Sequence, residues 1–120
     1  MTAPNIVNVS TITGKTVGAV LTTTTTTALL TNAASSGKVF KVNTVIISNV
    51  DGAVDADATL DYHNGTTGYR IIKSVTVPTN ASVIVLDKNT NIYLEEGDSL
   101  RGGALTASDL EIVIAYEEIS

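Results

Sequence analysis

Hydrophobic and polar residues alternate along much of this chain, which predicts β-strands with one buried face and one face in water. In VDADATLDYH, residues 54–63, the apolar side chains share one face, and the aspartates and His63 share the other, which we expect to be solvated. LEIVIAY alternates in the same way, with Leu110, Ile112 and Ile114 on its apolar face. Long stretches with the spacing of an amphipathic helix are lacking, so the pattern indicates an all-β protein.

Two further stretches are expected to be strands with less regular patterns. KVFKVNTVIISNV, residues 38–50, is one-sided at first and then apolar on both faces from Val45 to Ile47, which indicates a central strand. YRIIKSVTV changes phase between Ile71 and Val75, which predicts a β-bulge there. ASVIVLD and NIYLEE are expected to be shorter strands.

Turn-forming residues separate these strands. Asn64-Gly65 suits a tight hairpin, because both residue types adopt positive φ readily. Both prolines, Pro4 and Pro78, lie at the ends of the expected strands, where no ladder hydrogen bond is lost. Short strands with frequent turns predict a single antiparallel β-sandwich or jelly-roll-like domain. Alternation alone does not distinguish a sandwich from a closed barrel.

Six consecutive threonines interrupt the pattern within LTTTTTTALL. The run has neither the prolines of a mucin-like stalk nor the glycines and serines of a flexible linker. Because threonine is β-branched, we predict a strand over Leu21–Thr31, near a sheet edge, whose alternate hydroxyls face water or a partner. The predicted domain then spans residues 17–120, and residues 1–16 form an N-terminal arm or leading strand.

Composition removes several classes of function. The chain has 120 residues, of which 43% are hydrophobic and 16% are charged, so it can build one domain core. It has no cysteine, which rules out disulfides and thiolate metal sites. A net charge of −5 with dispersed lysines and arginines argues against nucleic-acid partners. We expect no membrane association, because no apolar stretch is long enough to span a bilayer.

Candidate catalytic and metal-binding groups each have a simpler structural interpretation. His63 is the one histidine, and we expect it to be exposed beside a hairpin and not part of a triad or metal centre. The aspartates of residues 51–61 do not fit the spacing of an EF-hand loop, and we expect those of residues 55–61 to line a solvated strand face. Glu95, Glu96 and Asp98 could form a carboxylate pair for glycoside hydrolysis, but they flank a glycine turn and the chain has no tryptophan to stack a sugar. We therefore expect no enzyme activity and no cofactor.

Three stretches carry a resemblance to a known group of proteins. SGKVFKVNTVIISNVDG, IYLEEGDSLR and the terminal AYEEIS together resemble the small β-sandwich virion structural proteins of marine tailed bacteriophages, and MTAPNIVNVSTITGKT is similar to that group's opening. The resemblance runs from about Thr22 to the C-terminus. One departure is TNAASSGK, where relatives often carry a proline before Gly-Lys.

The resemblance implies a virion protein, made in the cytoplasm of an infected bacterium. The expected function is capsid decoration or cementing of the phage head, with the major capsid protein or other virion proteins as partners and a homo-oligomer as the assembly. A neck or tail structural protein is the alternative, and a glycan-binding module is the alternative of another class. An extended arm and a polar edge strand can add to a neighbour's sheet, which gives these expected contact residues: Thr2, Pro4, Ile6, Val7, Val9, Thr22, Thr24 and Thr26.

Overall fold

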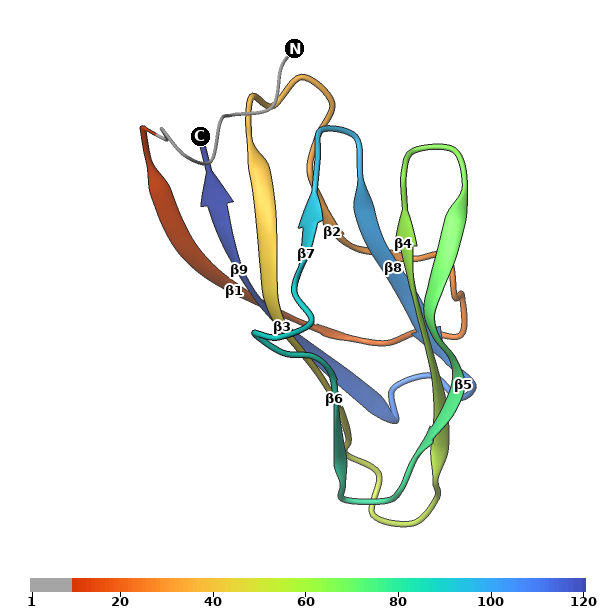
Figure 1. Ribbon diagram of the computed structural model, residues 1–120. Helices are drawn as coiled ribbons and strands as arrows, with labels where there is room; N and C mark the ends of the chain where they lie inside the picture. The colour runs from red at the N-terminus through yellow and green to blue at the C-terminus, as the bar shows by residue number, and fades with distance from the viewer. Residues whose placement is uncertain (1–9) are drawn as a thin grey trace.

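Nine strands form two antiparallel sheets packed face to face in the computed structural model, which describes residues 10–120 (Figure 1). The first sheet has five strands, which are β1 (Ile12–Val20), β3 (Val39–Asn49), β6 (Ser82–Leu86), β7 (Ile92–Leu94) and β9 (Leu110–Ile119). The second sheet has four strands, which are β2 (Ala28–Thr31), β4 (Ala56–His63), β5 (Gly68–Val77) and β8 (Ser99–Ala104). The predicted all-β, antiparallel sandwich is confirmed.

The chain crosses repeatedly between the sheets. The strand order is β1-β9-β3-β6 in the first sheet, where β7 also pairs with β3, and β2-β8-β4-β5 in the second. This is a jelly-roll-like path, in which strands distant in sequence become neighbours. The two sheets remain separate, so the structure is a sandwich and not a closed barrel.

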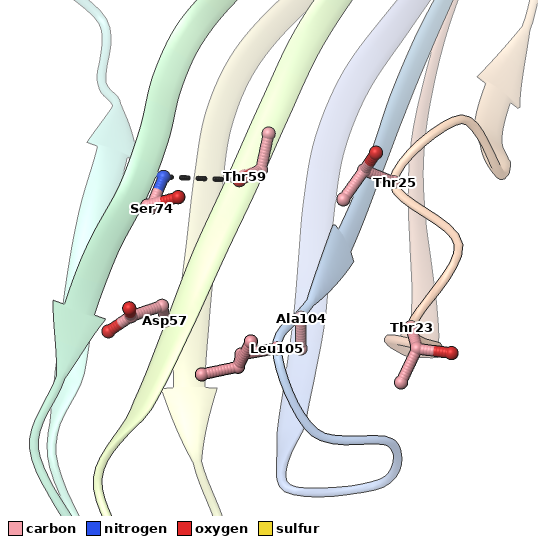
Figure 2. Close-up of a pocket in the computed structure, with 7 residues that line it drawn as sticks. All are labelled: Thr23, Thr25, Asp57, Thr59, Ser74, Ala104 and Leu105. Carbon is pink, nitrogen blue, oxygen red and sulfur yellow. Dashed lines mark hydrogen bonds between the residues drawn. The ribbon is translucent and has the colours of Figure 1, made fainter.

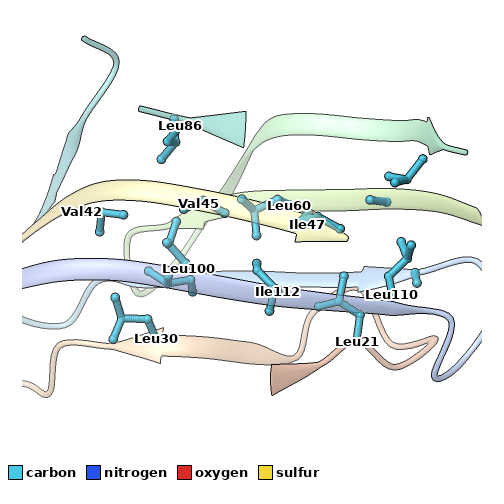
Figure 3. Packing of buried hydrophobic residues seen from close by; sticks show 14 of the residues in the cluster. Leu21, Leu30, Val42, Val45, Ile47, Leu60, Leu86, Leu100, Leu110 and Ile112 are labelled. Atoms are coloured by element: carbon cyan, nitrogen blue, oxygen red, sulfur yellow. The ribbon is translucent and has the colours of Figure 1, made fainter. Parts of the chain in front are cut away.

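The inner faces of both sheets supply one hydrophobic core (Figure 3). In β9, Leu110, Ile112 and Ile114 are buried while Val113 between them is exposed, as the alternation predicts. The strand β3 pairs with β9 on one side and with β6 and β7 on the other, which confirms the predicted central strand. From the opposite sheet, Leu60 and Leu100 complete the core.

A bulge interrupts β5 where the sequence changes phase. The pairing of β4 with β5 shifts register on both sides of Leu60, and Ser74 has a positive φ of 51°. The Ser74 amide donates a hydrogen bond to the Thr59 hydroxyl at 3.1 Å, which replaces a ladder bond that the bulge removes. The predicted bulge is confirmed.

The prediction of one strand over Leu21–Thr31 is wrong for most of its length. Only Ala28–Thr31 is a strand, and it lies at the edge of the four-stranded sheet as expected. The six threonines form a loop, which we call the threonine loop (residues 22–27). Its hydroxyls bond within the loop, because Thr27 Oγ1 donates to the Thr24 carbonyl at 2.8 Å and the Thr24 amide donates to Thr22 Oγ1 at 3.3 Å. Threonine hydroxyls compete with strand pairing in this way.

The threonine loop lies against β8, where glycines leave room for it. The Ala104 amide donates to the Thr22 carbonyl at 2.8 Å, and the Gly102 amide donates to the Thr27 carbonyl at 3.0 Å. Between them, a Cβ atom on Gly103 would lie 2.8 Å from the Thr22 carbonyl oxygen and 2.9 Å from that of Thr24. The loop therefore completes the hydrogen bonding of β8 beyond the end of β2.

The expected boundary between residues 16 and 17 falls inside a strand. From Ile12 to Val20, β1 pairs with β9 without a register shift. Residues 12–16 thus belong to the five-stranded sheet. Of the rest of the expected arm, Ser10 and Thr11 precede the strand, and residues 1–9 lie outside the described residues.

Replacing Gly103 with alanine tests the contact between β8 and the threonine loop. We expect Gly103→Ala to lower the free energy of unfolding by about 2 kcal/mol, because the added methyl group would overlap backbone oxygens that cannot move independently. Gly14→Ala is the matched control, since a Cβ atom there meets no atom within 4 Å. Urea denaturation followed by circular dichroism measures both, and equal stabilities for the two variants would contradict the contact.

Candidate interaction surface

The surroundings of His63 bear on whether it could be a catalytic or metal-binding histidine. His63 ends β4, and its Nδ1 atom accepts a hydrogen bond from the Gly65 amide at 3.3 Å in the hairpin that follows. Within residues 10–120, no group of three or more histidine, cysteine, aspartate or glutamate side chains lies close enough to hold a metal ion. The described residues therefore form no metal site at this imidazole.

Asp61 is buried, which corrects the expectation that it lies on a solvated strand face. Its side chain has no exposed area and lies on the outer face of the four-stranded sheet. Arg70 of β5 and Arg101 of β8 stand directly opposite it on the two neighbouring strands. Arg70 Nη1 lies 2.6 Å from Asp61 Oδ2, and Arg101 Nη2 lies 3.0 Å from the same oxygen. The two guanidinium groups cover the carboxylate from both sides.

Gly68 lies directly against this ion cluster. A Cβ atom at Gly68 would lie 2.6 Å from Arg101 Nη2 and 2.7 Å from Asp61 Oδ2, so a larger residue there would displace these side chains. The hydrogen bond to Asp61 raises the pKa of Arg101 above its ordinary value, against the opposing effect of burial. Both oxygens of the Asp61 carboxylate accept hydrogen bonds from arginines of the neighbouring strands, so the cluster joins β4, β5 and β8.

The glycine turn between β7 and β8 uses its carboxylates to hold the fold. Asp98 is buried, and its Oδ2 atom accepts hydrogen bonds from the Glu95 amide and from the Tyr62 hydroxyl, both at 2.9 Å. Glu96 Oε2 accepts a hydrogen bond from the Gly37 amide at 3.1 Å. The Asp98 and Glu96 carboxylates thus bond to separate partners within the chain.

The contact residues expected from sequence fall into two groups. Thr22, Thr24 and Thr26 are exposed, but they lie on the threonine loop and not along a strand edge. The remaining expected contacts lie outside the described residues, and they are Thr2, Pro4, Ile6, Val7 and Val9.

Beside the threonine loop, the outer face of the four-stranded sheet is hollowed (Figure 2). The hollow has a volume of about 160 Å³. Figure 2 shows Thr23 and Thr25 on the loop side and Asp57 and Ser74 on the strands across from them. The Asp57 carboxylate accepts a hydrogen bond from the Thr76 hydroxyl at 2.7 Å. Small hydroxyl groups around a shallow floor offer little to hold a small molecule tightly.

An apolar row crosses the outer face of the five-stranded sheet. It consists of Gly18, Val113, Ile46 and Ile84, which stand opposite one another on β1, β9, β3 and β6. Val113 is 46% exposed and Ile84 is 64% exposed. Gly18 has no side chain, and a shallow hollow of about 280 Å³ opens there between β1 and β9. An apolar side chain of a partner could occupy this hollow.

The residues on either side of the apolar row are mostly uncharged. The row of residues on one side contains Thr16, Ala115 and Thr44, which carry no charge. On the other side of the apolar row, Val20 is 49% exposed and stands opposite Glu111, which is charged. An exposed apolar band with a polar margin is the usual composition of a protein contact surface.

The signal for this surface was present in the sequence. In LEIVIAY, Val113 falls on the side assigned to solvent, where a strand of an isolated domain would carry a polar residue. What the sequence lacks is the register that aligns Val113 with Ile46 and Ile84, since β3, β6 and β9 are far apart along the chain.

Comparisons with known proteins assign no family. No protein-family model matches the chain, and no curated protein is significantly similar to it. In residues 10–120 no helix is long and apolar enough to cross a membrane.

Neutralising Asp61 tests the ion cluster. We expect Asp61→Asn to lower the free energy of unfolding by about 3 kcal/mol, because Arg101 is mostly buried and would lose its counter-charge. Asp57→Asn is the matched control on the same face of β4, and we expect it to cost about 1 kcal/mol or less, the value of its hydrogen bond to Thr76. Chemical denaturation measures both, and an Asp61→Asn variant as stable as Asp57→Asn would contradict the structural role.

Titration of Tyr62 gives a test at high pH. Burial and the hydrogen bond to Asp98 raise the pKa of Tyr62 from 10.0 to about 12. Between these values the unfolded chain releases the phenol proton while the folded chain keeps it, so the free energy of unfolding should fall as the pH rises through this range. Tyr62→Phe should remove that part of the decline. Tyrosinate absorbance gives the pKa directly, and complete ionisation of all four tyrosines near pH 10 in the folded protein would contradict it.

Proposed function

We propose that this chain is a structural protein of a tailed-phage particle, and specifically a capsid decoration or cement protein that stabilises the head. It would be made in the cytoplasm of the infected bacterium and incorporated into the virion. The sequence resemblance suggests this class, and the apolar row on the outer face of the five-stranded sheet is the observation that supports action through protein contacts. The fold alone does not decide the matter, because jelly rolls serve capsid, lectin and enzyme functions.

The character of the surface fits binding to a repetitive shell. The apolar row is flat and shallow, so a single contact would bury little area and have modest affinity. A shell offers many equivalent sites, and when linked copies bind them together the overall affinity greatly exceeds that of one contact. The small, uncharged residues beside the row, such as Thr16 and Ala115, allow close approach of a partner surface.

Copy number distinguishes the head from the neck or tail. Quantitative mass spectrometry of purified virions from the source would count this chain relative to the major capsid protein. Hundreds of copies per particle are the expected result for a decoration protein. A dozen or fewer would move the protein to the neck or tail, and complete absence would refute a virion role and favour the glycan-binding alternative.

Substitutions in the apolar row test its use in binding. We expect Val113→Lys and Ile84→Lys each to weaken binding to particles that lack this chain by about tenfold or more, the effect of placing an unpaired charge in an apolar contact. Leu105→Lys is the matched control, because Leu105 is 72% exposed but lies in the loop after β8, at the hollow on the opposite sheet. Co-sedimentation with the particles measures all three, and equal binding by the row variants and the control would contradict the proposed surface.

A further inference from the structure

We propose that two copies of this chain pair through β1, antiparallel and in register around a two-fold axis at Thr16, so that their five-stranded sheets become one continuous sheet. The inference deepens the proposed function, on which it rests for the role of the dimer in a particle. The pairing itself follows from the geometry of the strand and can be tested on the isolated protein.

The sandwich has four sheet edges in residues 10–120, and three of them are poor templates for pairing. The strand β2 has four residues and β6 has five, while β5 is broken by the bulge at Ser74. The fourth edge, β1, is nine residues long and pairs with β9 without interruption. Long regular edges attract other strands, and most proteins block them.

The hydrogen-bond pattern shows which groups of β1 face outward. Thr11 and Ser120 exchange two hydrogen bonds at 2.9 Å, and the Leu21 amide donates to the Leu110 carbonyl at 2.9 Å. Antiparallel pairs alternate between bonded and non-bonded positions, so the odd-numbered residues of β1 bond to β9. The even-numbered residues, which include Gly14, Thr16 and Gly18, therefore direct their amide and carbonyl groups toward the open edge. Within residues 10–120, no backbone group bonds to them there.

The sequence of β1 is complementary to itself about Thr16. An antiparallel copy centred on that residue places Thr16 opposite Thr16, Gly14 opposite Gly18, and Ile12 opposite Val20. The last pair matters most, because Ile12 is 55% exposed and Val20 is 49% exposed on the same outer face. The amide and carbonyl groups of all these residues point toward the open edge, so the residues would form the hydrogen-bonded pairs between the two copies.

The charge on β1 does not oppose the pairing. Lys15 is its one charged residue, and it lies opposite Val17 of the second copy in this register. Its ammonium group is 3.2 Å from Glu118 of its own chain, so its charge is matched before the copies meet. A two-fold axis perpendicular to the sheet also places both apolar rows on one side of the dimer, where they can contact one surface together.

A charge exchange at Thr16 tests the register directly. Thr16 is exposed, so a charged residue there is compatible with the fold. We expect the wild type to sediment as a dimer, and Thr16→Glu and Thr16→Lys to dissociate at least tenfold more readily, since like charges would meet across the axis. Mixing the two variants should restore the dimer. Thr31→Glu, at an exposed threonine of the edge strand β2, is the control and should remain dimeric.

A cysteine introduced at the axis gives a second readout that does not depend on stability. The chain has no cysteine, and Cα atoms in a hydrogen-bonded antiparallel pair are about 5.5 Å apart, within reach of a disulfide. Thr16→Cys should form a covalent dimer on mild oxidation, and Thr31→Cys should not. A monomeric wild type at every concentration, or a dimer that neither the charges nor the cysteine at Thr16 affect, would overturn the proposal. Particle binding by a monomer would leave the proposed function intact, and a dimer without particle binding would refute only the function.

Discussion

The packing of one face of each sheet against the other is the interaction on which the rest of the structure depends. Each strand can give alternate residues to the core, and the intervening residues must lie outside. The strand β9 shows this division most clearly, with Ile112 and Ile114 buried and Val113 between them exposed. Because only the inner faces form the core, the residues of the outer faces are free to serve solubility or binding. Evidence about function is therefore found on the outer faces.

The two outer faces differ in a way that separates structural from binding roles. On the four-stranded sheet, Asp61 forms ion pairs with two arginines, and the threonine loop covers the end of β8. These groups bond to partners within the chain. On the five-stranded sheet, the apolar row is exposed, and the adjacent edge of β1 directs backbone groups outward. The apolar row and the open backbone edge therefore lie on the same sheet, while the other sheet exposes Tyr69 and Val75 of β5.

Local pattern predicted most of the fold and little of this surface. Alternation identified the strands β3, β4, β5, β6, β7 and β9, the central position of β3 and the bulge in β5, because each depends on residues close together in sequence. It did not identify β8. The same reasoning failed at Asp61, whose arginine partners arrive from β5 and β8 through long-range register. It also failed at the threonine run, where the decisive features are hydroxyl bonding within the loop and the glycines of β8, including Gly103. The apolar row likewise exists only when strands β1, β9, β3 and β6 are aligned.

The apolar row and the open edge of β1 both support the proposal that this protein acts by assembly. Pairing through β1 would extend the sheet and align two apolar rows, and a larger aligned surface suits binding to a regular array. Asp98, one of the candidate catalytic carboxylates, accepts hydrogen bonds from the Tyr62 hydroxyl and the Glu95 amide instead.

Residue-resolved amide hydrogen exchange, measured by NMR at low and high protein concentration, tests the central claim most directly. We expect the amides of Gly14, Thr16 and Gly18 to exchange quickly in solution dilute enough to separate the copies and slowly in concentrated solution, because a second copy then bonds to them. The amides of Lys15 and Val17 should be protected at both concentrations by their bonds to β9. Fast exchange at Gly14, Thr16 and Gly18 at both concentrations would contradict assembly through this edge.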